Sequence, residues 1–122
     1  MKPTILIIED NVQNMYMLSY LLTSSGYSVI KAYNGIDGLN LADEKHPEII
    51  LVDIQLPDMD GYEICSNLRA NGLPENTVVI VVTSHAMGGV KEKAIEAGAN
   101  GYIEKPINPD TFVKQMECIF KA

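Results

Sequence analysis

The sequence predicts an α/β fold, a three-layer doubly wound arrangement in which one five-stranded parallel sheet is covered by helices on both faces. Five short apolar runs alternate strictly with five stretches whose apolar residues recur at helical spacing. Most runs are apolar at consecutive positions, which indicates strands that are buried on both sides, as parallel strands are. With 122 residues, 47% of them hydrophobic, the chain fits one compact domain over 1–122 and leaves no room for a second.

The elements follow in a regular order. The predicted strands are Thr4–Ile8, Tyr27–Ala32, Glu48–Asp53, Val78–Thr83 and Gly101–Glu104. Helical spacing is clearest in the first and last intervening stretches, at Met15, Leu18 and Leu22, and at Phe112, Met116 and Ile119. Because strand and helix alternate, right-handed crossovers place helices on both faces of the sheet.

Glycine, asparagine and proline mark the expected helix ends. Gly26, Gly72 and Gly98 stand where helices should stop, since glycine readily adopts the left-handed conformation that follows a last turn. Asn34 and Asn108 stand where helix caps are expected, with Pro109 at a first helical position.

The charge balance excludes some partners. The formal net charge is −7, with 16 acidic against 9 basic residues and no run of Lys or Arg, so direct nucleic-acid binding is not expected. Cys65 and Cys118 lack a paired spacing and are predicted to be reduced thiols in or near the core. Met1-Lys2-Pro3 leads directly into an apolar strand, and no signal-type or membrane-length apolar span follows, so a cytoplasmic location without membrane insertion is expected.

Polar residues that could bind ligands or take part in catalysis follow the predicted strands. In doubly wound sheets the ligand crevice lies beyond the carboxyl ends of the strands. The residues at those ends are Glu9-Asp10-Asn11, Asp53, Thr83-Ser84 and Glu104-Lys105-Pro106. Carboxylates placed close together repel one another unless a cation is present, and oxygen ligands favour a hard ion such as Mg²⁺. A carboxylate beside such an ion can attack phosphorus, because the metal and a nearby ammonium offset the charge on the transferring oxygens.

Each of these residues also has an ordinary structural explanation. Glu9, Asp10 and Asn11 could cap the first helix, where acidic residues are favoured. Thr83 alone is more often a β-branched strand residue, and Lys105 alone is more often a solvated amine. Asp53 differs from them, because it closes a buried run and begins no helix. Only the convergence of all of them at one edge makes the functional interpretation specific.

Taken as a set, these residues resemble the receiver domain of two-component response regulators across essentially the whole chain. The matching pieces are Glu9-Asp10-Asn11, Asp53-Ile54-Gln55-Leu56-Pro57-Asp58-Met59-Asp60-Gly61, Thr83-Ser84 and Lys105-Pro106. The amino-acid sequence of these pieces is most similar to that of single-domain, DivK-like receivers and of receivers of hybrid kinases. The resemblance implies a flavodoxin-like sheet with strand order 2-1-3-4-5.

The resemblance also implies roles for individual residues. Asp53 would be the phosphoacceptor. Asp10 and Asp53, with the backbone carbonyl of Gln55, would bind Mg²⁺, and Glu9 would act on the ion through water. The donor would be a histidine kinase or a histidine phosphotransfer protein, and the protein would catalyse only its own phosphorylation and dephosphorylation.

Further roles concern the response to phosphorylation. By resemblance, Thr83 and Lys105 would hold the phosphoryl oxygens, and the Lys105-Pro106 peptide would be cis. Tyr102, otherwise an ordinary edge-strand aromatic, would turn inward on activation. The signal would then leave through a protein-binding surface. The apolar residues expected there, or else in ordinary packing, are Val90, Ile95, Tyr102 and Phe112.

Departures from the family pattern are few. Ser84 stands where alanine is common, and its hydroxyl could alter access to the phosphoryl group. Leu56 replaces a common methionine with a near-isosteric side chain. His85 is expected at the mouth of the site, with a surface-loop imidazole as the ordinary interpretation, and His46 is expected in a loop.

Three other functions remain to be weighed. An Asp-nucleophile phosphatase would need a second acid two residues after the first, where Gln55 stands and cannot transfer a proton. A flavin carrier of the same topology would need a phosphate cradle after the first strand, where Glu9 and Asp10 would repel phosphate. A receiver-like interaction module that works without phosphorylation usually lacks the acceptor or the acidic pair, and both are present.

Overall fold

The computed structural model describes residues 2–84 and 89–121, in which strands and helices alternate in the predicted order. The strands are β1 (Thr4–Ile8), β2 (Ser28–Ala32), β3 (Ile49–Asp53), β4 (Val78–Thr83) and β5 (Gly101–Glu104). The helices are α1 (Val12–Ser24), α2 (Gly35–Lys45), α3 (Gly61–Ala70), α4 (Val90–Glu96) and α5 (Phe112–Phe120). No helix in the described ranges has both the length and the apolar character needed to cross a membrane.

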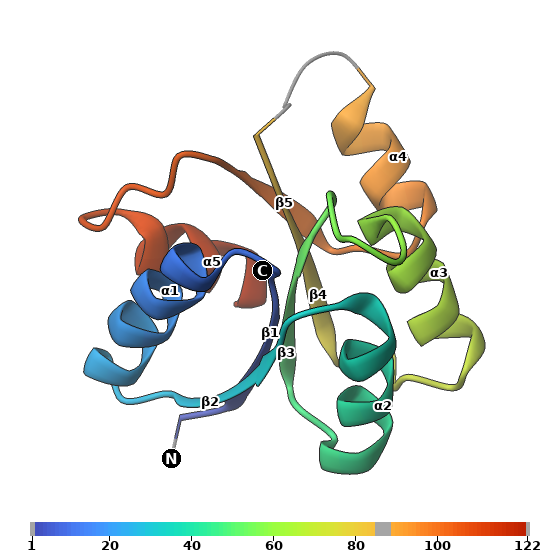
Figure 1. Ribbon diagram of the computed structural model, residues 1–122, viewed down its shortest axis with the longest axis horizontal. Helices are drawn as coiled ribbons and strands as arrows, with labels where there is room; N and C mark the ends of the chain where they lie inside the picture. Colours follow the sequence, from blue (N-terminus) through green and yellow to red (C-terminus); the bar gives the residue numbers. More distant parts are fainter. Residues whose placement is uncertain (1, 85–88, 122) are drawn as a thin grey trace.

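The five strands form one parallel sheet in the order β2-β1-β3-β4-β5. Helices α1 and α5 cover one face of this sheet, and α2, α3 and α4 cover the other (Figure 1). The predicted flavodoxin-like, doubly wound fold is therefore confirmed. From β1 the chain adds β2 on one side and then β3, β4 and β5 on the other, so the direction in which strands are added reverses between β1 and β3. The carboxyl ends of these two strands therefore flank the expected ligand crevice.

Two apolar cores lie on either side of the sheet. Alternate residues of β1 point to opposite faces, so that Ile5 and Ile7 pack against α1 and α5, whereas Leu6 and Ile8 pack against α2 to α4. Every residue of β3 is buried. The central strand is thus enclosed by neighbouring strands at both edges and by helices on both faces, which explains its continuous apolar sequence.

Three helices end in the same way. Gly26, Gly72 and Gly98 have φ angles of +95°, +89° and +106°, in the left-handed region that glycine adopts without a Cβ clash. After α1, the Gly26 N–H donates to the Thr23 carbonyl and the Tyr27 N–H donates to the Leu22 carbonyl. This Schellman pattern confirms the predicted helix stops.

The same pattern explains a small difference at β2. Tyr27 is expected in the strand, but its N–H is used to close α1, and the strand begins at Ser28. Glu48 likewise falls just before β3, although its backbone already bonds to Thr4 and Val78 on the two neighbouring strands. Both differences are one residue long and leave the strand ends at the carboxyl edge where they were predicted.

Helix starts agree with the sequence in one predicted case and differ in the other. The Asn34 side chain accepts a hydrogen bond from the Asp37 N–H at 2.8 Å, which confirms Asn34 as the cap of α2. Asn108 does not cap α5, because that helix begins at Phe112. The Asn108 side chain instead accepts from the Asp110 N–H at 2.9 Å, and so forms a turn that precedes the helix.

One prediction about buried residues needs correction. Cys65 is buried in α3 as predicted, but Cys118 is exposed on α5. Phe112, expected on an output surface or else in ordinary packing, is fully buried between α5 and the sheet, which agrees with ordinary packing. Of the other residues proposed for that surface, Ile95 is 47% exposed, whereas Val90 and Tyr102 are half-buried.

Arg69, near the end of α3, forms hydrogen bonds to the loops that lead into β4 and β5. Its guanidinium donates hydrogen bonds of 3.0 to 3.1 Å to the carbonyls of Gly98, Pro74 and Thr77 and to the Asn100 side chain. The Asn100 side-chain oxygen also accepts from a backbone N–H of β4. One side chain therefore joins α3 to two separate loops.

Candidate functional site

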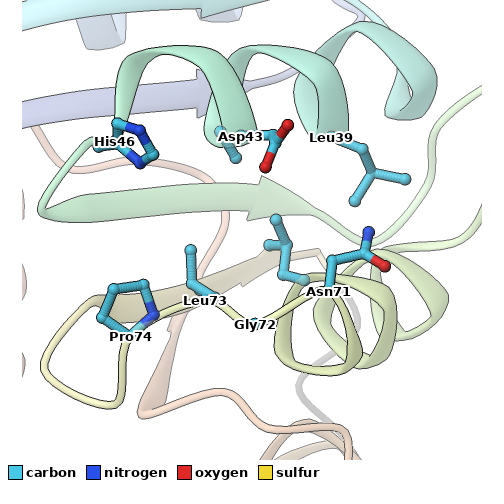
Figure 2. Close-up of a pocket in the computed structure, with 9 residues that line it drawn as sticks. Leu39, Asp43, His46, Asn71, Gly72, Leu73 and Pro74 are labelled. Carbon is cyan, nitrogen blue, oxygen red and sulfur yellow. The ribbon is translucent and has the colours of Figure 1, made fainter.

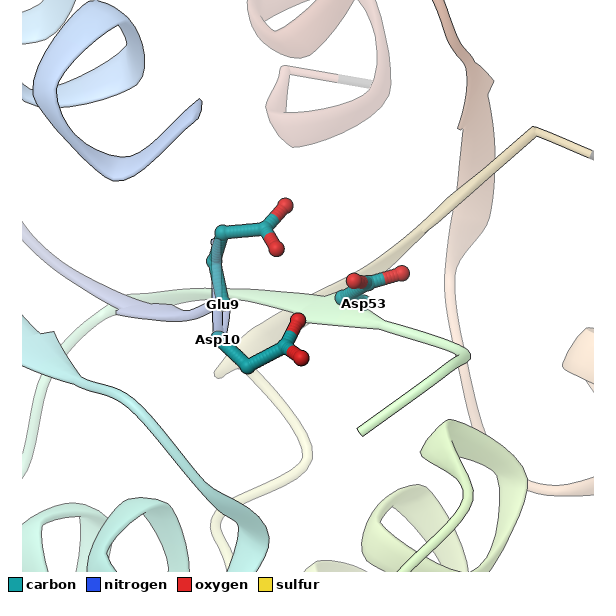
Figure 3. A group of neighbouring side chains, drawn as sticks. All are labelled: Glu9, Asp10 and Asp53. Atoms are coloured by element: carbon teal, nitrogen blue, oxygen red, sulfur yellow. The ribbon is translucent and has the colours of Figure 1, made fainter. Parts of the chain in front are cut away.

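Three carboxylates meet at the carboxyl edge of the sheet (Figure 3). Glu9 and Asp10 directly follow β1, and Asp53 is the last residue of β3. One side-chain oxygen from each lies within 4.8 Å of those of the others. Glu9 and Asp53 are buried, at 1% and 6% exposure, and Asp10 is exposed. The cluster is thus open to solvent on the Asp10 side.

Sheet register accounts for this meeting. Ile8 of β1 lies opposite Val52 of β3, so the next residue on each strand carries its side chain beyond the same edge. The Glu9 N–H still donates to the Ala32 carbonyl of β2 at 3.0 Å, which holds the start of the loop against the sheet. Carboxylates that repel one another are therefore held together by the backbone hydrogen bonds of the strands.

Lys105 supplies the positive charge of the site. It follows β5, and its Nζ donates to Glu9 Oε1 at 2.8 Å and to Asp53 Oδ2 at 3.3 Å. Burial of the ammonium would lower its pKa, but the hydrogen bond to Glu9 and the negative charges of Asp53 and Glu9 outweigh burial and raise the pKa. Lys105 therefore stays charged at neutral pH and pairs with two of the three carboxylates.

The backbone after Asp53 is turned back sharply. Asp53 Oδ1 accepts from the Gln55 N–H at 3.2 Å, and the Ile54 carbonyl accepts from the Gly61 N–H at 2.8 Å. A Cβ atom on Gly61 would lie 2.7 Å from the Asp53 carbonyl oxygen, so glycine is required at this approach. The Gln55 N–H is thus held against Asp53 by a loop whose base is tightly closed.

Two further predicted residues lie on β4 and β5. Thr83 ends β4, is 2% exposed, and accepts a hydrogen bond from the Lys105 N–H at its carbonyl, at 2.7 Å. Tyr102 of β5 lies opposite Val81 and packs against the core beneath α2 to α4, away from the carboxylates. The Lys105–Pro106 peptide bond is cis. The structure therefore brings Thr83 and Lys105 to the edge that holds the cluster. Tyr102 lies within β5, before the strand reaches that edge.

The remaining sequence candidates have separate places. Asn11 is the cap of α1, since its side chain accepts from the Asn14 N–H at 2.9 Å. Ser84 is exposed and lines an open hollow with Lys105 and its two successors, Pro106 and Ile107. His85 lies outside the described residues. His46 ends α2 in a left-handed conformation with φ of +50°.

One residue of the matching motif is given no role by the sequence interpretation. Asp58, in the loop after β3, accepts hydrogen bonds from the Gly35 and Ile36 N–H groups at 2.8 and 2.9 Å. These contacts lower the pKa of the Asp58 carboxyl, with the Gly35 bond as the largest cause. The partners are 22 and 23 residues apart in sequence, so no local pattern could have indicated the pairing.

A small cavity elsewhere does not belong to this site. It has a volume of about 70 Å³ and lies between the end of α2, with Leu39, Asp43 and His46, and the chain that follows α3 (Figure 2). Because α2 and α3 run back from the carboxyl edge of the sheet, their last turns lie at the opposite edge. The cavity is therefore remote from the acidic cluster.

Comparison with known proteins decides the family. A family model described as the response regulator receiver domain matches residues 5–117. The chain belongs to the response regulator receiver family. This receiver is thus a phosphoryl-accepting signalling domain of two-component systems. Polar-differentiation response regulators DivK of Brucella ovis and Brucella abortus are 38% identical to it over 117 residues, which are 96% of this chain and 95% of each relative.

Solved receivers have the same fold. Chemotaxis response regulator CheY4 of Vibrio cholerae matches this receiver with a TM-score of 0.92 and 26% identity, over 98% of this chain and 99% of that one. The receiver domain of sensor histidine kinase PA1611 from Pseudomonas aeruginosa matches over all of both chains, with a TM-score of 0.88 and 29% identity. That structure has a magnesium ion coordinated in its active-site cleft.

The donor set of this receiver suits the same kind of ion. Glu9, Asp10 and Asp53 offer carboxylate oxygens only, and hard divalent cations such as Mg²⁺ prefer oxygen ligands. Mg²⁺ usually keeps several of its waters in proteins, and exposed Asp10 leaves room for them. The Lys105 ammonium already lies against two of the carboxylates, which indicates that the cluster is built to hold positive charge.

Proposed function

We propose that Asp53 accepts a phosphoryl group from a phosphohistidine in a Mg²⁺-dependent reaction. The supporting observation is that Asp53 closes a strand whose residues are all buried and still lies against Glu9, Asp10 and Lys105 at the open edge of the sheet. Glu9 shares these neighbours, but of the three carboxylates only Asp53 is itself part of a strand, since Glu9 and Asp10 follow β1.

The reaction is an in-line displacement at phosphorus. An oxygen of the Asp53 carboxylate forms the new O–P bond, and the P–N bond to the donor imidazole breaks, with its electron pair left on the imidazole nitrogen. A bound Mg²⁺ would supply charge neutralisation at the transferring oxygens. Asp10, Asp53 and the Gln55 carbonyl would hold it directly, and Glu9 through water.

Lys105 and Thr83 have complementary parts in this proposal. The Lys105 ammonium, which remains charged, would pair with a phosphoryl oxygen and offset the charge that develops during transfer. The Thr83 hydroxyl would donate to a second oxygen. Because Lys105 already contacts Asp53 at 3.3 Å, it can follow the new group without leaving the site.

Signalling would then depend on partner proteins. The donor would be a histidine kinase or a histidine phosphotransfer protein. A downstream protein would read the change in Thr83 and the turn of Tyr102, through a surface that includes Ile95, which is 47% exposed.

The experiment is phosphorylation by a small-molecule phosphodonor with Mg²⁺ present, followed by mass spectrometry. The expected result is one labelled residue, Asp53, and no labelling in Asp53→Asn. Asp43→Asn, which changes an exposed carboxylate of α2, is the matched control and should be labelled like the wild type. Labelling of Asp53→Asn at the wild-type rate would disprove the acceptor assignment.

A further inference from the structure

The start of α2 is capped by two residues, one of which comes from a distant loop. The first two N–H groups of the helix, at Gly35 and Ile36, donate to the two carboxylate oxygens of Asp58. The next N–H, at Asp37, donates to the Asn34 side chain, and the Gly38 N–H bonds to the Asn34 carbonyl. Every N–H group of the first turn therefore has an acceptor, and Asp58 supplies two of them.

The loop that carries Asp58 is the one that carries Gln55. Its base is closed by the bridge between Gln55 and Asp60 and by the Gly61 to Ile54 hydrogen bond. Its tip reaches α2 through Asp58 and through Met59, whose Sδ lies so close to Gly35 that a Cβ atom there would be 2.9 Å from it. The loop is therefore held at both ends, by the sheet and by α2.

Helix electrostatics favour this attachment. The amino-terminal end of a helix carries a partial positive charge, so a carboxylate that accepts two of its N–H groups is held more firmly than a neutral acceptor would be. The lowered pKa of Asp58 keeps it ionised at neutral pH. At neutral pH the attachment is thus one between a charged carboxylate and the helix N-terminus.

We propose that Asp58 is a positioning residue of the metal site, which holds the Gln55 carbonyl in place by fastening the loop tip to the start of α2. The proposal rests on the proposed function, because it takes the Gln55 carbonyl as a Mg²⁺ ligand. Mg²⁺ tolerates little departure from octahedral geometry, so its affinity depends on how closely each ligand is held. By linkage, binding of the ion also changes the environment of the Gly35 and Ile36 N–H groups.

The test is a Mg²⁺ titration followed through backbone amide chemical shifts in wild type, Asp58→Ala, Asp58→Asn and Asp37→Asn. Asp58→Ala should weaken Mg²⁺ binding by about tenfold, the lower end of the range for residues that orient a ligand. Asp58→Asn retains one acceptor oxygen and should give an intermediate loss. The Gly35 and Ile36 amide signals should shift with Mg²⁺ in wild type and should not respond in Asp58→Ala.

Asp37→Asn separates positioning from simple charge. It removes one negative charge from the same turn of α2 without touching the loop, so its Mg²⁺ affinity should stay close to that of wild type. The loss in Asp58→Ala should also persist at high salt, where long-range charge effects are screened. Unchanged affinity in Asp58→Ala, or an equal loss in Asp37→Asn, would overturn the proposal. Absence of Mg²⁺ binding in wild type would overturn the metal step of the proposed function as well.

Discussion

Lys105 Nζ lies 2.8 Å from Glu9 Oε1, although the two residues are 96 positions apart in sequence. The contact joins the ends of β1 and β5 across the open edge of the sheet. Since the folded-state pKa of Lys105 is raised, its contribution to stability is fully present below its ordinary pKa of 10.5 and is lost as pH rises through the folded-state value. The positive charge of Lys105 is therefore constant across neutral pH.

Mg²⁺ should stabilise the fold, because the ion removes repulsion among Glu9, Asp10 and Asp53. A ligand at 100 times its dissociation constant adds about 2.7 kcal/mol to the free energy of unfolding. In Asp10→Asn the metal-free protein should be more stable than wild type, and the Mg²⁺-dependent rise in melting temperature should be much smaller. Thermal unfolding with and without Mg²⁺ measures both effects. An unchanged Mg²⁺ response in the variant would show that Asp10 is no ligand.

Phosphorylation should be felt at Tyr102 through Thr83. A Thr83 hydroxyl drawn toward a phosphoryl oxygen would free space beside β4, and the half-buried Tyr102 ring could turn into it. A beryllofluoride mimic should therefore shift the amide signals of β5 and α4 in wild type, and these shifts should be much reduced in Thr83→Ala. Coupling of this kind is worth about 1–3 kcal/mol. Equal shifts in both proteins would exclude Thr83 as the route.

Alkaline pH should destabilise the contact between Tyr27, which precedes β2, and α5. The Tyr27 hydroxyl donates a hydrogen bond to Glu117, and the Tyr27 pKa rises from 10.0 to about 12, through burial first and then through this bond and the Glu117 charge. Because the folded-state pKa is raised, this stability is complete below pH 10 and is lost as pH rises toward about 12. Urea unfolding between pH 9 and pH 12, an interval of about 3 units that spans both values, should show a shallower decline in Tyr27→Phe than in wild type.

Loss of the Arg69 guanidinium should weaken the fold far from the acidic cluster. Arg69→Met would leave the acceptors on Gly98, Pro74, Thr77 and Asn100 without this donor. The free energy of unfolding should fall by about 1–3 kcal/mol, measured from urea denaturation midpoints.

Lys45→Met is the matched control for Arg69→Met. Among the described residues Lys45 makes only an exposed, 3.9 Å ion pair with Glu44, so its replacement should change the free energy of unfolding by less than about 0.5 kcal/mol. A cost for Arg69→Met no larger than that of the control would mean that the Arg69 contacts contribute nothing to stability.

The sequence was sufficient for features that arise from local pattern. Continuous apolar runs predicted the strands, and the rule that parallel strands end at one edge predicted that Glu9, Asp10 and Asp53 would meet. Glycines after helices predicted the left-handed turns at Gly26 and Gly72, because only a local φ preference is involved.

Features that depend on distant contacts were not predictable in this way. The capping of α2 by Asp58 requires the three-dimensional path of a loop more than 20 residues away. The Asn108-Pro109 pair fits a helix start and a turn equally well, and the fold selects the turn.

Cys118 is a different case, because its exposure could have been predicted from the local spacing. Phe112, Met116 and Ile119 define the buried face of the last helix, and Cys118 lies off that face.

The proposed acceptor carboxylate belongs to a strand that is paired on both sides. Asp53 continues β3, whose backbone is bonded to β1 and β4 and whose side chains are all buried. Its amides should be among the slowest to exchange with deuterium, since exposing them requires opening the whole sheet. A bulky dianionic group attached there cannot be accommodated by movement of the strand that carries it. The loops at the carboxyl edge of the sheet would therefore have to move instead, and phosphorylation of a rigid strand end would change the conformation of those loops.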